Sequence, residues 1–172
     1  MSWQAIGSIA ELVGAVGVII SLLYLAVQIR QSTKATKVAT AHAISAAVRE
    51  WNQPMLEDAD LSWTFTVGTE DPARLDERER SRFYQICFSF FRMFEDVHYQ
   101  YEHGVLEAEI REGYKLHYAA YAKAPGMLAY WNLRRHTYHP RFRDFLDMYE
   151  PPRLARIGAL VGGTAWRGEE AR

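Results

Sequence analysis

The chain has 172 residues, 20 basic and 21 acidic side chains, a formal net charge of -1, and a single cysteine, Cys87. This length suits one membrane helix with one folded domain, and the near-zero charge argues against a nucleic-acid partner. One cysteine excludes an intramolecular disulfide, so the domain needs no oxidising compartment.

The first predicted element is an apolar helix at residues 6–27, in which Glu11 is the only charged side chain. At about 1.5 Å per residue it would be about 33 Å long, enough to cross a hydrocarbon core of about 30 Å. A cleaved signal peptide carries its positive charge before the apolar run, whereas here the basic residues follow it. We therefore predict a retained transmembrane helix within residues 1–29.

Charge also predicts the orientation of this helix. Arg30, Lys34 and Lys37 follow the apolar run, and no acidic residue lies between Gln28 and Arg49. Basic residues beside a transmembrane segment favour the cytoplasmic side of the membrane. We expect the N-terminus outside the cell and the rest of the chain in the cytoplasm, with membrane lipid as its first partner.

Small residues on one side of the predicted span form a candidate oligomer interface, which we call the small-residue face. They recur every three or four residues, so they share one side of a helix: Gly7, Ala10, Gly14, Gly17 and Ser21. Membrane helices associate through close backbone approach along such faces. We expect a homo-oligomer or docking on a larger membrane protein. The alternative is a single helix with the glycine content usual for a span.

Glu11 is the intramembrane polar residue of this prediction. A carboxyl group at that depth is costly, so it normally faces a partner, a protein interior or water. In an oligomer Glu11 would lie beside the small-residue face, where a ring of carboxyl groups could select cations or sense protons. The alternative is a span that begins near Ala10 and covers Leu12–Ile29, with Glu11 at the membrane interface or hydrogen-bonded and neutral.

The segment LLYLAVQIRQST, residues 22–33, resembles a widespread group of small, uncharacterised bacterial single-pass membrane proteins with a YLAVQIRQ-type segment near the N-terminus. The similarity continues into FEDVHYQYEHG, residues 94–104, and PGMLAYW, residues 125–131. The resemblance implies a bacterial inner-membrane location. It implies no activity, and no functional residue is transferred from that group.

A juxtamembrane helical extension is predicted for residues 30–55. No Gly or Pro occurs between Val18 and Gln53, so the helix should continue until Pro54 ends it. Apolar residues at spacings of three and four form one stripe along it: Ala41, Ile44, Val48, Trp51 and Met55. We expect this stripe to pack on the domain that follows. The alternative is pairing with the same helix of a second subunit.

Residues 56–152 are predicted to form an all-α, bundle-like cytoplasmic domain. Asp76 and Glu79 have the spacing of a capping box, and Gly104 is the expected stop of the helix that begins there. Its abundant aromatic residues make this the expected core helix. Only Ser62–Val67 alternates weakly, in the pattern of a strand.

Shorter helices are predicted further along the domain, at about 106–124, 125–136 and 140–149. The last two begin with proline, which is favoured in the first helical turn. Residues 153–172 form the predicted tail, whose apolar run of ten residues is too short to span a bilayer. We expect this tail to be flexible or to lie at the membrane surface.

Glu95 and His98 form a Glu-x-x-His motif on the predicted core helix, the spacing that places two ligands on one metal in di-iron carboxylate bundles. Those sites need a second such motif and two further carboxylates, and no residues with matching spacing occur here. We expect instead a buried polar cluster of Arg92, Glu95 and His98 that fixes helix packing. A membrane-tethered metalloenzyme using Glu95 and His98 stays as an alternative.

No catalytic residue, metal or cofactor is predicted. Cys87 falls among aromatic residues, where a thiol would be buried and inert. His136 and His139 lie on either side of a helix break and are expected in a surface loop. The sequence contains no Gly-rich phosphate loop, nucleophile elbow or Walker pattern.

The function these patterns favour is a membrane-anchored homo-oligomer with a cytoplasmic interaction or regulatory domain, which would form a pore if Glu11 lined a symmetric axis. A second hypothesis is an accessory subunit that docks on a larger membrane complex through the same small-residue face. The third is the metalloenzyme described above.

Overall fold

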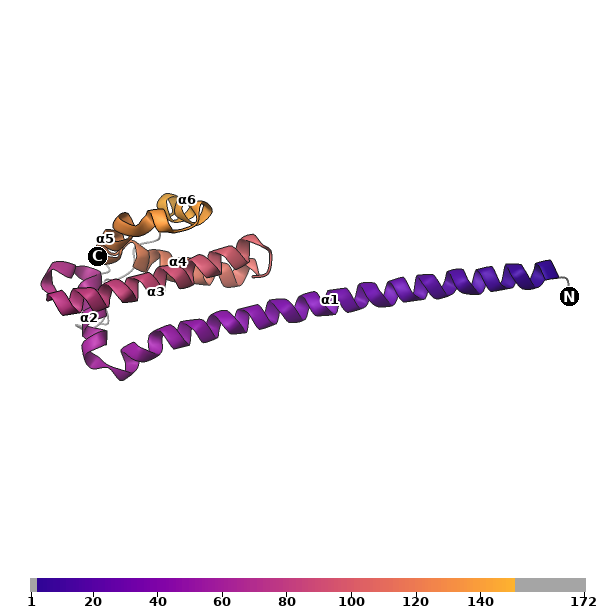
Figure 1. The fold of residues 1–172 in the computed structure, drawn as a ribbon, viewed down its shortest axis with the longest axis horizontal. Coiled ribbons are helices and arrows are strands. Elements are labelled where there is room, and N and C mark those ends of the chain that lie inside the picture. The colour runs from indigo at the N-terminus through magenta and orange to yellow at the C-terminus, as the bar shows by residue number, and fades with distance from the viewer. Residues whose placement is uncertain (1–2, 151–172) are drawn as a thin grey trace, which may run out of the picture. The chain divides into compact units, whose positions relative to one another are not determined.

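A computed structural model describes residues 3–150. Over this range the chain forms α-helices and two short 3-10 helices, with no strand, so the prediction of an all-α fold is confirmed. The α-helices are α1 (Trp3–Glu57), α2 (Ala59–Glu70), α3 (Glu77–Glu102), α4 (Ala108–Ala122), α5 (Pro125–Arg134) and α6 (Pro140–Met148), and the 3-10 helices are η1 (Pro72–Arg74) and η2 (Arg135–Thr137) (Figure 1). The predicted tail at 153–172 lies outside the described residues.

The chain divides into two compact units, and the boundary after Thr40 falls inside α1. The described part of the first unit is a single helix with every side chain from Glu11 to Ile29 exposed. By length and composition this helix can cross a membrane, and none of its most apolar stretch is buried inside the protein.

The second unit begins with the last turns of α1, which pack on the domain. Ile44 is buried against Val97 and Leu106, and the indole ring of Trp51 lies edge-on to Phe65 at 5.6 Å between ring centroids. The predicted packing of the apolar stripe is thus confirmed at these positions. The buried Ile44 and half-buried Trp51 side chains hold this part of α1 against the second unit.

The prediction that Pro54 ends the first helix is wrong by one turn. Proline lacks the N–H that would donate to the carbonyl of Glu50, but its fixed backbone angle is compatible with a helix. The α1 helix therefore continues to Glu57. It ends at Asp58, which is the N-cap of α2.

The weak strand candidate at Ser62–Val67 is also wrong, because these residues lie within α2. The side chain of Asp58 accepts hydrogen bonds from the backbone N–H groups of Asp60 and Leu61, at 2.9 and 3.1 Å, and so caps the helix. Its β-branched residues are tolerated because tertiary packing overrides their modest helix propensity.

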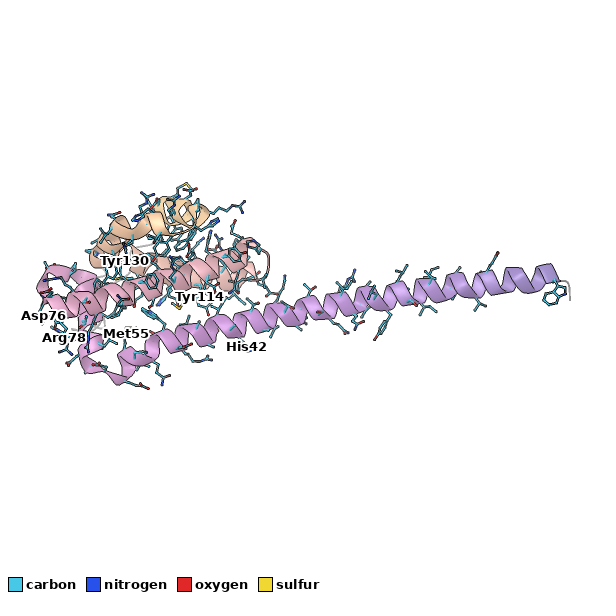
Figure 2. The ribbon with its side chains drawn as sticks, in the orientation of Figure 1. His42, Met55, Asp76, Arg78, Tyr114 and Tyr130 are labelled. Carbon is cyan, nitrogen blue, oxygen red and sulfur yellow. The ribbon has the colours of Figure 1, made fainter. Side chains whose placement is uncertain are left out.

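The core of the second unit is built around α3, as predicted. The capping box of Asp76 and Glu79 is present at its start, and Asp76 is labelled in Figure 2. Gly104 follows the end of the helix with a φ of 70°, a conformation that favours glycine. Aromatic side chains fill the interior on several sides of this helix, among them Phe83, Phe90, Phe91 and Phe94.

Helices α2 and α5 meet at a glycine pair. The carbonyl oxygen of Gly68 lies 1.8 Å from the position that a Cβ atom at Gly126 would occupy. Only a residue without a side chain allows this close backbone approach. The crossing places α5 so that Tyr130 and Trp131 are buried in the core beside α3.

Candidate functional site

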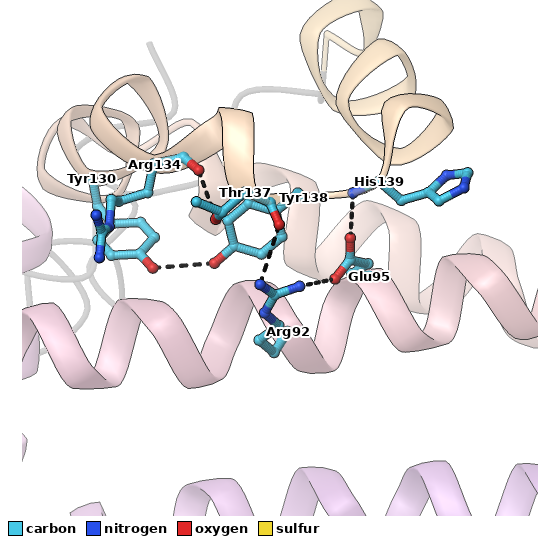
Figure 3. A network of polar contacts seen from close by, with 7 residues as sticks. All are labelled: Arg92, Glu95, Tyr130, Arg134, Thr137, Tyr138 and His139. Atoms are coloured by element: carbon cyan, nitrogen blue, oxygen red, sulfur yellow. Dashed lines mark hydrogen bonds and ion pairs between the residues drawn. The ribbon is translucent and has the colours of Figure 1, made fainter.

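Polar side chains of α3 bind the segment that joins α5 to α6, in an arrangement we call the polar clamp: Arg92, Glu95, Thr137 and His139. The guanidinium of Arg92 donates to a carboxylate oxygen of Glu95 at 2.7 Å and to the carbonyl of Thr137 at 3.2 Å. The other carboxylate oxygen of Glu95 accepts from the backbone N–H of His139 at 2.6 Å. Figure 3 shows that these bonds tie α3 to the start of α6.

An aromatic contact supports the clamp from one side. The guanidinium carbon of Arg92 lies 4.5 Å from the ring centroid of Tyr138, a cation–π geometry. The hydroxyl of Tyr138 lies 3.1 Å from that of Tyr130 (Figure 3). Burial and the hydrogen bond with Tyr130 raise the pKa of Tyr138 far above its ordinary value, so the ring stays neutral beneath Arg92.

His98 lies one turn after Glu95 and is only 7% exposed. Its ring stacks on Phe145 at 4.6 Å between centroids. Among the described residues its Nε2 atom is buried without a hydrogen-bond partner. Buried polar atoms are nearly always paired, so an unpaired one singles out His98 as a candidate for binding a polar group.

Burial lowers the pKa of His98 below its ordinary value. The nearby charges act in both directions, because Glu102 and Glu95 raise this pKa while Arg111 and His139 lower it. Burial is the largest of these influences. The imidazole is therefore neutral at pH 7, and one ring nitrogen can accept a hydrogen bond while the other donates.

A pocket of about 620 Å³ lies beside His98, between α3 and the beginning of α6. Its lining combines basic, acidic and aromatic groups, namely Arg92, Glu95, Asp96, His98, Tyr99, Glu102, His103, His139, Arg141 and Phe142. An ion pair between Arg141 and Glu102, at 3.5 Å, joins α6 to α3. Such a lining can hydrogen-bond a small polar molecule. No group of three or more His, Cys, Asp or Glu suited to hold a metal ion occurs between residues 3 and 150.

The predicted cluster of Arg92, Glu95 and His98 is therefore brought together only in part. Arg92 and Glu95 form an ion pair, but 41% of the Arg92 side chain is exposed, so the pair is not buried. His98 lines the same pocket and forms no hydrogen bond with either residue. The backbone groups of Thr137 and His139 complete the clamp. Sequence reasoning missed them because they lie more than 40 residues away and contribute no side-chain atom.

Other candidate residues of the second unit lie as predicted. Cys87 is fully buried, with its sulfur atom 3.4 Å from that of Met127, and burial raises the pKa of its thiol far above the ordinary value. A thiol in this state is a poor nucleophile. His136 and His139 are exposed on either side of the end of η2.

The small-residue face and Glu11 lie in the first unit. Apart from the neighbouring backbone of their own helix, Gly7, Gly14 and Gly17 have no atom within 4 Å of the position of an added Cβ. Ser21 and Glu11 are exposed, and the side chain of Ala10 lies outside what the structure describes. This face is thus open along its described residues, and its role in association stays a prediction.

No protein-family model, curated protein or solved structure matches this chain. The resemblance to small bacterial membrane proteins therefore stays an expectation. The function has to be argued from the residues themselves.

Proposed function

We propose that this chain is a single-pass protein of the bacterial inner membrane, anchored by the first part of α1, whose helical domain is a cytoplasmic interaction or regulatory module. The observation that carries the proposal is the exposure of the apolar side chains between Leu12 and Ile29. The large ones are each 47% to 69% exposed. Apolar surface of this extent needs a cover other than water. The segment is about 27 Å long, close to the thickness of the hydrocarbon core of a bilayer, about 30 Å.

The polar groups of this segment support lipid as the cover. No charged residue occurs from Leu12 to Ile29. The hydroxyl of Ser21 donates to the carbonyl of Gly17 at 2.8 Å, so it needs no partner outside the helix. Because the helix also satisfies its own backbone groups, moving this segment into hydrocarbon leaves few polar groups unpaired.

The basic residues beyond Ile29 favour a cytoplasmic domain. For such a domain the pocket beside His98 supplies a candidate site for a regulatory ligand, because its lining combines acidic, basic and aromatic side chains. The small-residue face supplies the candidate surface for homo-oligomer formation. Pore formation would require Glu11 to line the axis of such an oligomer.

Fractionation tests the membrane anchor. We expect the full-length chain in the membrane fraction after an alkaline carbonate wash, and in solution only after detergent is added. Two reporter enzymes fused after Arg172 test the orientation. One that is active only in the cytoplasm should be active, and one that is active only in the periplasm should be inactive. Recovery of the chain in the soluble fraction without detergent would refute the proposal, and a periplasmic reporter would refute its orientation.

A pair of matched variants tests the oligomer. Replacing Gly14 and Gly17 with leucine should prevent close approach along the small-residue face and reduce crosslinking in mild detergent. The control replaces Val16 and Ile19 with leucine on the opposite side of the same helix, and should crosslink as wild type does. Equal crosslinking of both variants would exclude this face as the interface. Co-purification with unrelated polypeptides would favour the accessory-subunit hypothesis.

A further inference from the structure

Three basic side chains of α1 form a stripe directly after the apolar segment: Arg30, Lys34 and Lys37, which we call the basic stripe. Their spacings of four and three place them on one side of the helix. Arg30 and Lys34 are exposed, and Lys37 is half-buried. Within the part of the chain that the structure describes, no hydrogen bond or ion pair of these three side chains is found.

The surrounding helix contains nothing that neutralises this charge. No Asp or Glu occurs from Leu12 to Arg49. The neighbouring hydroxyl groups of Thr33 and Thr36 donate to backbone carbonyls one turn earlier, at 2.9 and 3.0 Å. The three cationic groups therefore have no acidic partner within reach along their own helix.

The basic stripe lies at the depth of the lipid headgroups if the apolar segment crosses a bilayer. Counted from Ile29 along the helix axis, Arg30 lies about 1.5 Å, Lys34 about 7.5 Å and Lys37 about 12 Å further on. The headgroup layer adds roughly 5–8 Å on each side of the hydrocarbon core. Helical side chains tilt toward the N-terminus, here toward the membrane, and Lys and Arg are long enough to reach back to the phosphate level.

We propose that the basic stripe binds the phosphate headgroups of anionic phospholipids in the cytoplasmic leaflet of the bilayer that α1 crosses. The proposal rests on the proposed membrane anchor and names the lipid class that this anchor selects. Charge complementarity supports it, since unpaired cations on one helix side face a layer of phosphates. Each basic side chain near an anionic leaflet strengthens the binding of the protein to anionic lipid about fivefold. Salt weakens this attraction by screening the charges.

The test uses the full-length chain in nanodiscs of phosphatidylcholine and phosphatidylglycerol in equal parts. Native mass spectrometry of the released protein counts the molecules of each lipid retained per chain. For wild type we expect phosphatidylglycerol to exceed phosphatidylcholine by about fivefold. Preparation at about 1 M salt should reduce this ratio toward one, because the Debye length then falls to about 3 Å.

The decisive variant replaces Arg30, Lys34 and Lys37 with glutamine and should bring the lipid ratio to one. A control variant with the same loss of charge replaces Arg74, Arg78 and Lys123, which lie outside the stripe, with glutamine. It should keep the wild-type ratio of phosphatidylglycerol to phosphatidylcholine. A wild-type ratio of one, or a stripe variant that retains its preference, would overturn the inference alone. A chain that does not co-purify with the nanodiscs would overturn both the membrane anchor and the inference.

Discussion

Glu95 holds α3 and the start of α6 together with a single carboxylate. One of its oxygens accepts from Arg92 and the other from the backbone N–H of His139. Glu95→Gln keeps the size of the side chain but leaves only one oxygen to accept, so one of the two bonds is lost and the other is no longer made to a charged group. We expect a loss of about 1–2 kcal/mol of unfolding free energy. Denaturant unfolding of the chain in mild detergent, followed by tryptophan fluorescence, measures this loss. Glu50→Gln, at an exposed position of α1, should stay within about 0.5 kcal/mol of wild type.

His98 should make the stability of the domain depend on pH. Because burial lowers its pKa in the folded state, the unfolded chain binds the proton more readily below the ordinary pKa of about 6.5. The unfolding free energy therefore falls as pH decreases from about 6.5 toward the folded-state pKa of His98. We expect His98→Gln to lose less stability than wild type between pH 7.5 and pH 5.5.

The comparison for His98 is between slopes, so a general destabilisation by the buried glutamine does not affect it. His136→Gln, at an exposed position, serves as the matched control and should lose stability between these pH values as wild type does. If the His98 variant and wild type lost the same amount, the neutral buried state assigned to this imidazole would be wrong.

Among the elements, the crossing of α2 and α5 is the most sensitive to a small change. Gly126→Ala would place its Cβ atom 1.8 Å from the carbonyl oxygen of Gly68, and backbone cannot move aside as a flexible side chain can. We expect a loss of about 3 kcal/mol or more, or a chain that does not fold. Thermal unfolding followed by circular dichroism measures the effect.

Gly113 provides the matched control for this prediction. It lies inside α4, is exposed, and has no atom within 4 Å of an added Cβ. Gly113→Ala should therefore raise stability by about 0.5–1 kcal/mol, because alanine loses less backbone entropy in a helix. If the variants at 113 and 126 behaved alike, the close approach at Gly126 would not control the packing of α5.

The helices that the sequence predicts well are those with local signals at their ends. The capping box at Asp76 and the glycine at 104 delimit α3, and Pro125 and Pro140 lie at the first turns of α5 and α6. The helix α2 was missed because the alternation of its apolar residues resembles that of a strand. The informative signal there was Asp58, an N-cap residue that precedes the segment.

The candidate site was predictable only where its residues share one helix. The spacing of Arg92, Glu95 and His98 places them within two turns of α3, and the structure brings the first two into contact. The approach of Thr137, His139 and Arg141 depends on how α6 packs against α3, which no local pattern encodes. The stacking of Phe145 on the ring of His98 likewise depends on how α6 packs.

For the whole molecule, the division into two units predicts a soluble fragment. All buried core residues of the described chain lie at or beyond Ile44, so residues 31–172 retain the complete core. We expect this fragment to remain in solution without detergent and to unfold cooperatively. Size-exclusion chromatography and circular dichroism measure both properties. An aggregated fragment, or one without helical signal, would show that the domain depends on the apolar segment.

Cys87 has a practical consequence for spectroscopy. It is the only thiol of the chain, and it is fully enclosed by the core. A cysteine introduced at an exposed position, such as Ser32→Cys, would therefore react with a spin label or fluorophore while Cys87 stays unmodified. Distances between copies of the chain and depths in a bilayer thus become measurable without a cysteine-free background.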